Sequence, residues 1–356
     1  MVGRERLREV DSNIKYKRDY SIDLLKSIAI IGVIVIHTCS YNYEIASPNW
    51  TFSVFWGSVA RASVPIFFMC SGALFLLPHR DFSTRKLFSK SLPRIIIAML
   101  VWAMFYKVFH LGVDGSLTIA QLIQGLKEVL LFNQEFHLYY LQILLMVYLF
   151  LPLSRVLTQN ASQRELQYLL LLWFAFGIIY PTVISFWPFK LLSGIAVQYK
   201  INMTYAAIGY GILGFYLKQY PPEKRKCYWA FALSGFLFVF GGTCYMSVQN
   251  GLLYTGFLEG MSLGVALLAV GIFGLGSSIN TPGNEILRKG IAYISKASFC
   301  IFLAHMFFIY LLRLSGLSFT WPTIISIPII TLLIFTCSLL LYPILLRIPV
   351  VNKWLI

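Results

Sequence analysis

The stretch IDLLKSIAIIGVIVIHTCSY, residues 22–41, has the length and composition of a membrane-spanning helix, yet it carries side chains that are costly in hydrocarbon. Asp23 and Lys26 lie near its start, and His37 lies near its end. At 100° per residue, Lys26 and His37 point within about 20° of each other and are separated by about 16 Å along the axis. The stretch therefore predicts a polar stripe that faces protein or a water-filled cavity, because facing lipid is costly.

The whole chain shares this apolar character. Of its 356 residues, 58% are hydrophobic and 12% are charged, against about 25% charged residues in an ordinary soluble domain. Apolar runs of about 20 residues recur, and each is long enough to cross about 30 Å of hydrocarbon. The runs are continuously apolar and do not alternate, which favours helices over a barrel. The predicted fold class is an all-α integral membrane protein with about ten transmembrane helices.

A single membrane domain is expected over residues 21–347, between a basic N-terminal tail (1–20) and a short C-terminal tail (348–356). The sixth span is short and glycine-rich, so it is expected to be tilted, broken or packed closely against a neighbour. The ten spans are predicted near residues 22–41, 54–77, 91–110, 138–156, 167–187, 203–217, 228–247, 258–277, 297–315 and 323–346.

The distribution of basic residues predicts the orientation. The net charge is +15, and most arginines and lysines fall in loops on one side of the predicted bundle. The other side receives only Lys127, Lys190, Lys200 and Arg313. By the positive-inside rule, both termini are expected in the cytoplasm. No nucleic-acid motif appears, and the surplus charge suits anionic lipid headgroups or a phosphate-bearing substrate.

Other spans carry further polar candidates, each with a structural alternative. Arg61 is expected at about the same depth as His37, but it could only anchor a helix by pairing with carbonyl groups. His137, Tyr140 and Gln142 lie at the outer end of the fourth span, where an aromatic belt is the default. Lys26 could snorkel to the interface, and His37 or the mid-span His305 could be structural histidines. The close-packing pair Ser71–Gly72 lies in the second span.

Several chemistries have no matching motif. The sequence has no HExxH or close histidine–carboxylate cluster for a metal, no GxSxG elbow and no Walker loop. An enzyme built on these residues is expected to act by direct transfer with a histidine base. No metal and no permanently bound cofactor are expected.

Four blocks in order, IDLLKSIAIIGVIVIH, RASVPIFFMCSGALF, FHLYYLQILLMVYLFLPL and ISKASFCIFLAHMFF, resemble acyltransferase family 3. Its members are bacterial membrane O-acyltransferases that modify cell-surface glycans, and the chain is similar to the stand-alone O-acetyltransferase branch. The likeness is strongest for a basic residue, ten intervening positions and a histidine, met here by Lys26 and His37. The family usually has arginine where Lys26 stands, and its paired arginines near the second span are matched only by Arg61.

The resemblance implies an acyl donor, an acyl acceptor and a cellular location. Acetyl-CoA, or another acyl-CoA, would be the donor substrate from the cytoplasmic side of a bacterial inner membrane. A hydroxyl of a glycan or of a lipid-linked saccharide would be the acceptor. Lys26, Asp23 and Arg94 are expected to bind acyl-CoA, and His37 and Arg61 to act as base and oxyanion donor. His137, Tyr140 and Gln142 are expected to meet the acceptor, with His305 and Ser71 as further candidates.

A rival hypothesis is a transporter or flippase for a polysaccharide precursor or a small metabolite. Intramembrane charges and a short glycine-rich span are compatible with it, whereas the missing internal repeat speaks against it. The oligomeric state stays open at this stage, as does the choice between direct transfer and an acyl-histidine intermediate.

Overall fold

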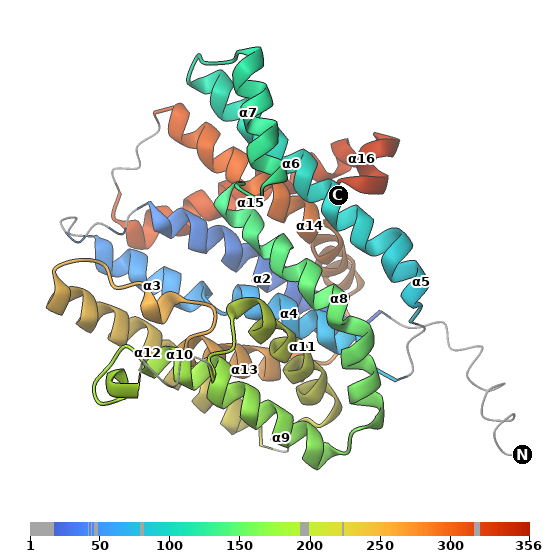
Figure 1. Cartoon of the computed structure of the whole chain (residues 1–356), viewed down its shortest axis with the longest axis vertical. Coiled ribbons are helices and arrows are strands. Elements are labelled where there is room, and N and C mark those ends of the chain that lie inside the picture. The colour runs from blue at the N-terminus through green and yellow to red at the C-terminus, as the bar shows by residue number, and fades with distance from the viewer. Residues whose placement is uncertain are drawn as a thin grey trace, which may run out of the picture.

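The computed structural model describes residues 18–41, 43, 45, 49–78, 82–192, 199–222, 224–316 and 321–356. Most of the predicted N-terminal tail lies outside these residues. Within them the secondary structure is helical, without strands, and nine helices are long and apolar enough to cross a membrane. The elements, shown in Figure 1, are α2 (Tyr20–Ser40), α3 (Trp50–Ala60), α4 (Ser63–Phe75), α5 (Thr84–Lys86), α6 (Leu92–Val113), α7 (Ile119–Leu130), α8 (Tyr139–Asn160), α9 (Gln163–Trp173), α10 (Tyr180–Val183), α11 (Met203–Gln219), α12 (Arg225–Asn250), α13 (Leu263–Ser277), α14 (Glu285–Leu314), α15 (Thr323–Leu346) and α16 (Pro349–Trp354).

The short sixth span is α11, and close packing is the alternative that the structure shows. Its 17 residues cover about 25 Å at 1.5 Å per residue. A Cβ atom built on Gly72 of α4 would lie 1.7 Å from the carbonyl oxygen of Gly211, and one on Gly214 would lie 2.1 Å from that of Met69. Only glycine permits backbones to approach this closely. The contact fixes α4 against α11.

The second predicted span is broken into α3 and α4 at Arg61–Ala62. Pro65 follows four residues after Arg61, so it cannot donate a hydrogen bond to the Arg61 carbonyl and its ring crowds that group. A serine hydroxyl, that of Ser63, bonds instead to the carbonyl oxygen of Ala60 at 2.6 Å. The break leaves the Arg61 side chain at the joint between two half-helices.

Two segments differ from the expected limits. The third span begins earlier than residue 91, because a π-helical turn, Leu87–Ser91, joins α5 to α6 and carries the helix through polar residues. The connection between the predicted third and fourth spans, residues 111–137, contains α7, which packs against α6 and projects from the bundle in Figure 1. Both segments are too polar to be recognised as hydrophobic runs, but their residues still have good helix propensity.

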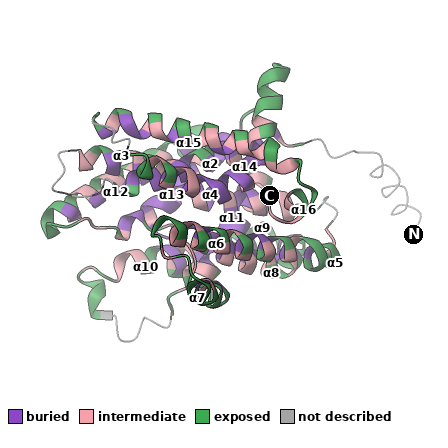
Figure 2. Ribbon diagram, turned by 90° about the horizontal axis from the view of Figure 1, so that it is seen from above, coloured by how far each residue is buried: buried purple, intermediate pink, exposed green. Residues whose placement is uncertain are grey.

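The helix α2 lies at the centre of the bundle and contacts α3, α4, α13, α14 and α15. In their most apolar stretches, 56% of the residues of α2 and of α14 are buried, against 22% for α12 and 28% for α15. Figure 2 shows the same division, with buried residues concentrated in α2, α4, α13 and α14. The polar residues of the opening stretch are therefore surrounded by protein and not by lipid.

Candidate active site

Three histidines from separate helices meet in the interior. His37 comes from the last turn of α2, His137 from the 3₁₀ turn Phe136–Leu138, and His305 from the middle of α14. The ring centroids of His37 and His305 are 5.0 Å apart, those of His137 and His305 are 5.3 Å apart, and those of His37 and His137 are 6.3 Å apart. The residues are 9%, 1% and 0% exposed for His37, His137 and His305. We call these three residues the imidazole cluster.

The cluster has nitrogen atoms that no described residue satisfies. The Nδ1 atom of His305 lies 2.6 Å from the carbonyl oxygen of Phe302, so this nitrogen carries the hydrogen and donates. The Nε2 atom of His305 and both ring nitrogens of His137 are buried without a hydrogen-bond partner among the described residues. Buried polar atoms normally have partners. The cluster therefore has unused hydrogen-bonding capacity for a substrate.

Aromatic rings enclose the cluster. Tyr106 packs against His137 with centroids 5.2 Å apart, and its hydroxyl donates to the Leu303 carbonyl oxygen at 2.7 Å. The Phe136 ring lies 5.0 Å from that of His37, and Phe136 is 51% exposed. Tyr106 was not among the sequence candidates, because an isolated tyrosine in an apolar run carries no functional signal.

A cavity of about 800 Å³ lies between α2, α4, α6, α8 and α14, with α16 at its edge. Its lining includes four basic residues, Lys26, Lys90, Arg94 and Lys353, and no acidic residue. Lys90, Arg94 and Lys353 are exposed, which marks this end as the mouth, whereas Lys26 is partly buried and donates to the Ser295 carbonyl oxygen at 3.3 Å. We call this space the basic cavity. Its size is within the range of about 300–1,000 Å³ for ligand pockets.

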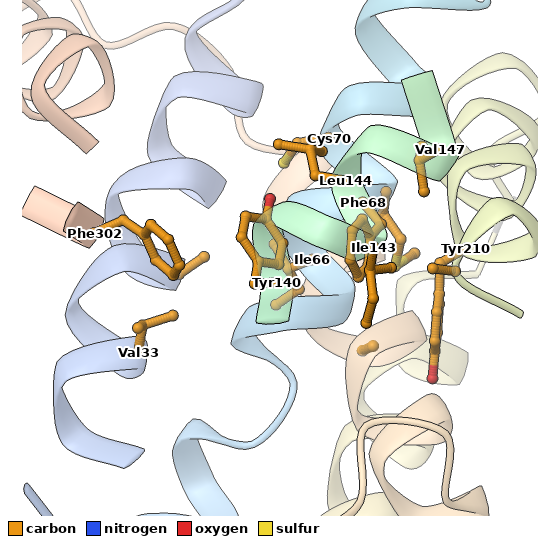
Figure 3. Close-up of a cluster of buried hydrophobic side chains, with 14 of the residues drawn as sticks. Val33, Ile66, Phe68, Cys70, Tyr140, Ile143, Leu144, Val147, Tyr210 and Phe302 are labelled. Atoms are coloured by element: carbon orange, nitrogen blue, oxygen red, sulfur yellow. The ribbon is translucent and has the colours of Figure 1, made fainter. Parts of the chain in front are cut away.

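Two aromatic residues separate the basic cavity from the imidazole cluster. Tyr140 and Phe302 both line the cavity, and their rings are 5.0 Å apart. The Phe302 ring lies 5.8 Å from His137 and 6.0 Å from His305. Figure 3 shows Tyr140 between Phe302 and Phe68, and the Tyr140 and Phe68 rings are 5.2 Å apart. One layer of side chains thus lies between the cavity and the cluster.

The residues expected to bind acyl-CoA divide into two sets. Lys26 and Arg94 line the basic cavity, whereas Asp23 does not. The Asp23 carboxylate accepts hydrogen bonds from the Ser295 hydroxyl at 2.7 Å and from the Arg18 guanidinium. Asp23 therefore connects α2 to α14 one turn before Lys26. It positions these helices and does not form part of the cavity wall.

The acceptor candidates are also divided. Tyr140 lines the basic cavity instead of facing an outer surface, and Ser71 lines it too, with its hydroxyl donating to the Phe67 carbonyl oxygen at 3.0 Å. His137 belongs to the imidazole cluster. Gln142 is partly buried and lies outside the cavity lining, and its side chain makes no hydrogen bond to a described group. The fourth span thus turns most of its polar residues inward.

Arg61 is held by the backbone. Its Nε atom donates to the carbonyl oxygen of Leu258, in the turn before α13. This is the anchoring alternative raised for Arg61, and the positive charge of its guanidinium also acts on the His37 ring. Arg61 thus connects the α3–α4 joint to the loop that precedes α13.

A second polar group lies beside the cluster and was not expected from the sequence. The carboxylate of Glu135 lies 2.6 Å from Nε2 of His110 and accepts from the Tyr310 hydroxyl at 3.0 Å. Glu135 directly precedes Phe136, which contacts His37. His110 of α6, Glu135 before the 3₁₀ turn and Tyr310 of α14 are distant in the sequence, so no spacing could have predicted that they meet. Nowhere in the described ranges do three or more His, Cys, Asp or Glu residues form a group able to hold a metal.

The fold and this site define a multi-pass helical membrane protein with a basic cavity beside buried imidazoles. The family model that matches is Acyl_transf_3, an acyltransferase domain, over residues 19–343. The chain therefore belongs to this acyltransferase family. No curated protein and no solved structure matches the chain.

Proposed function

We propose that this chain is a membrane O-acyltransferase that moves an acyl group, expected to be acetyl, from acyl-CoA to a hydroxyl of a cell-surface glycan or its lipid-linked precursor. Membership of the acyltransferase family supports acyl transfer. The observation that carries the proposal is that only one layer of side chains separates the basic cavity from the imidazole cluster.

The donor would occupy the basic cavity. Lys90 and Arg94 at the mouth, and Lys26 deeper in the cavity, would neutralise the phosphates of acyl-CoA, because no acidic lining residue competes for them. The apolar and aromatic walls would hold the pantetheine arm, with the thioester next to Tyr140 and Phe302. A rotation of the Phe302 side chain would bring the acyl carbon to the cluster, as ligand binding commonly changes rotamers.

His37 would act as the general base. An acceptor hydroxyl attacks the thioester carbonyl carbon, a C–O bond forms and the C–S bond breaks. His37 takes the hydroxyl proton and returns it to the departing sulfur, so the products are the ester and free CoA thiol. The unpartnered nitrogens of His137 and His305 would orient the acceptor hydroxyl or the carbonyl oxygen. A dry site strengthens such interactions. The bond to Leu258 uses only the Nε atom of Arg61, and the Arg61 charge acts on His37, so its remaining guanidinium N–H groups would stabilise the oxyanion.

The acceptor would approach past Phe136. This ring is half exposed and lies against His37. The adjacent group of His110, Glu135 and Tyr310 offers a carboxylate, a hydroxyl and an imidazole, which suit sugar hydroxyl groups. We place the basic mouth in the cytoplasm, where acyl-CoA is made, and the chain in a bacterial inner membrane.

The test is release of CoA thiol by the purified protein in nanodiscs with acetyl-CoA, together with acetyl-CoA binding. Wild type is expected to bind acetyl-CoA and to release thiol slowly to water. His37→Ala is expected to bind but not release. Asn160→Ala is the control, because Asn160 is exposed at the end of α8 and lies outside both the basic cavity and the cluster. Absence of both binding and release in wild type would contradict the proposal, and so would equal release by wild type and His37→Ala.

A further inference from the structure

The helix α16 lies beyond the matched family region, which ends at residue 343. It nevertheless returns to the bundle and packs against α6, as Figure 1 shows at the end marked C. The Trp102 indole donates to the Leu355 carbonyl oxygen at 3.2 Å, and the Arg94 guanidinium donates to the main-chain oxygen of Ile356. Ile356 is 4% exposed. These contacts hold the segment Pro349–Ile356 in place at the basic cavity.

This segment contributes two residues to the cavity wall, Lys353 and Trp354. The Lys353 ammonium lies 5.1 Å from the centre of the Trp354 ring. Lys353 is exposed and Trp354 is partly buried, so both stand at the mouth with Lys90 and Arg94. None of these three cations makes an ion pair with an Asp or Glu side chain in the part of the chain that the structure describes.

An indole face beside cations that no Asp or Glu side chain neutralises has a specific complementarity. Aromatic side chains stack on nucleobases of any sequence because every base has a π face. Lysine and arginine bind phosphate groups through charge-assisted hydrogen bonds. Phosphate alone would require only the cations, and an acyl chain would require only apolar walls. The combination at one mouth matches a purine nucleotide that carries several phosphates.

We infer that α16 is the nucleotide-recognition element of the donor site: Trp354 stacks on the adenine of CoA, and Lys353 with Lys90 binds its phosphates. The inference rests on the proposed function, since it names the part of the donor that this end of the cavity takes. It assigns donor recognition to a segment outside the matched family region. Arg94 connects the matched family region to the segment that contains α16, because it lines the cavity and is bonded to Ile356.

The experiment measures the affinities of CoA, 3′,5′-ADP and pantetheine for the full chain in nanodiscs by calorimetry. The variants are Trp354→Ala and Lys353→Ala, with Lys353→Arg as the charge-conserving variant. Asn352→Ala is the matched control, because Asn352 is exposed on the same helix and does not line the cavity.

Wild type is expected to bind 3′,5′-ADP. Trp354→Ala and Lys353→Ala are each expected to weaken CoA and 3′,5′-ADP about tenfold, the loss of about 1.4 kcal/mol. Pantetheine affinity is expected to stay unchanged, and Lys353→Arg and Asn352→Ala to resemble wild type.

Failure of wild type to bind 3′,5′-ADP would overturn the inference. Equal weakening of pantetheine would also overturn it, because that result assigns α16 a purely structural role. Unchanged CoA affinity, with binding to anionic vesicles lost in Lys353→Ala, would assign the cations to lipid phosphates instead. The proposed function fails separately, if wild type binds CoA but never releases thiol from acetyl-CoA with an acceptor preparation present.

Discussion

The basic cavity and the imidazole cluster are neighbours with opposite physical character. The cavity has exposed lysines and an arginine at its mouth, where water screens each charge and can replace a lost contact. The cluster has three histidines between 0% and 9% exposed, with nitrogens that no described group satisfies. Water does not compensate a change in such a place. Substitutions in the cavity should therefore reduce activity gradually, whereas substitutions in the cluster should reduce it sharply.

The largest effect is expected for His37→Ala. Loss of a general base typically costs about 10²–10⁴-fold in rate, so kcat for transfer is expected to fall by this factor. The donor dissociation constant should stay within about twofold, because the substitution leaves the cavity charges unchanged. Steady-state kinetics and acetyl-CoA binding check the two values. A large loss of donor affinity without a fall in kcat would reverse the roles assigned to the two regions.

The next effect concerns the packing that holds the cavity wall. In Gly72→Ala the new methyl group would lie 1.7 Å from the Gly211 carbonyl oxygen, which forces α4 and α11 apart. Overpacking of this kind costs about 1–3 kcal/mol of unfolding free energy. Thermal unfolding in detergent is expected to show a lower midpoint for Gly72→Ala. Gly241→Ala is the control, because a Cβ atom there meets nothing within 4 Å. Equal midpoints for the two variants would refute the close contact.

A smaller, graded effect is expected at Lys26. Lys26→Ala should raise KM for acetyl-CoA about tenfold with kcat nearly unchanged, because it removes one charge-assisted contact, of about 1.5–3 kcal/mol at most. Lys26→Arg keeps the charge and should retain a KM close to that of wild type. Initial rates over a range of acetyl-CoA concentrations measure both. If Lys26→Ala lowered kcat as strongly as His37→Ala, donor binding could not be assigned to the cavity and catalysis to the cluster.

The smallest effect is expected at Asp19, which caps α2 and pairs with Lys218 at 2.9 Å. Burial opposes its ionisation, but the hydrogen bond from Ser21 and the ion pair with Lys218 outweigh burial and lower the pKa of Asp19 below 3.8. A lowered carboxyl pKa contributes stability above about pH 4, which is lost as pH falls through the folded-state value.

Asp19→Asn keeps the cap and removes the charge, because asparagine caps helices as well as aspartate. Its unfolding midpoint should lie slightly below that of wild type at pH 6, and the gap should close as the pH approaches 3. Thermal unfolding across this pH range measures the gap. A gap that persists or widens in acid would show that the charge of Asp19 does not stabilise the fold.

The sequence predicted the all-α membrane fold and the acyltransferase family, and both are confirmed. It did so because hydrophobic length and a basic residue eleven positions before a histidine are local properties of the chain. The same local geometry predicted that Lys26 and His37 share a face. In the structure Lys26 reaches the basic cavity, and His37 reaches the imidazole cluster.

The rest of the site depends on packing between distant segments. His137 and His305 are separated from His37 by three or more helices in the sequence, so no spacing could place their rings within 6.3 Å of His37. Asp23 was expected at the donor, but its bond to Ser295 depends on α14. A segment as short as α16, six residues beyond the last apolar run, is expected to be a tail, and only the contacts of Trp102 and Arg94 reveal that it reaches the cavity.

Photolabelling tests most directly whether the basic cavity delivers an acyl group to the imidazole cluster. A CoA thioester with a diazirine in its acyl chain is irradiated with the protein in nanodiscs, and the labelled residues are mapped by mass spectrometry. Labels are expected on Tyr140, Phe302 and the cluster, and excess CoA is expected to abolish them. Labels on the lipid-facing helices, or labels that excess CoA leaves unchanged, would contradict delivery to the cluster.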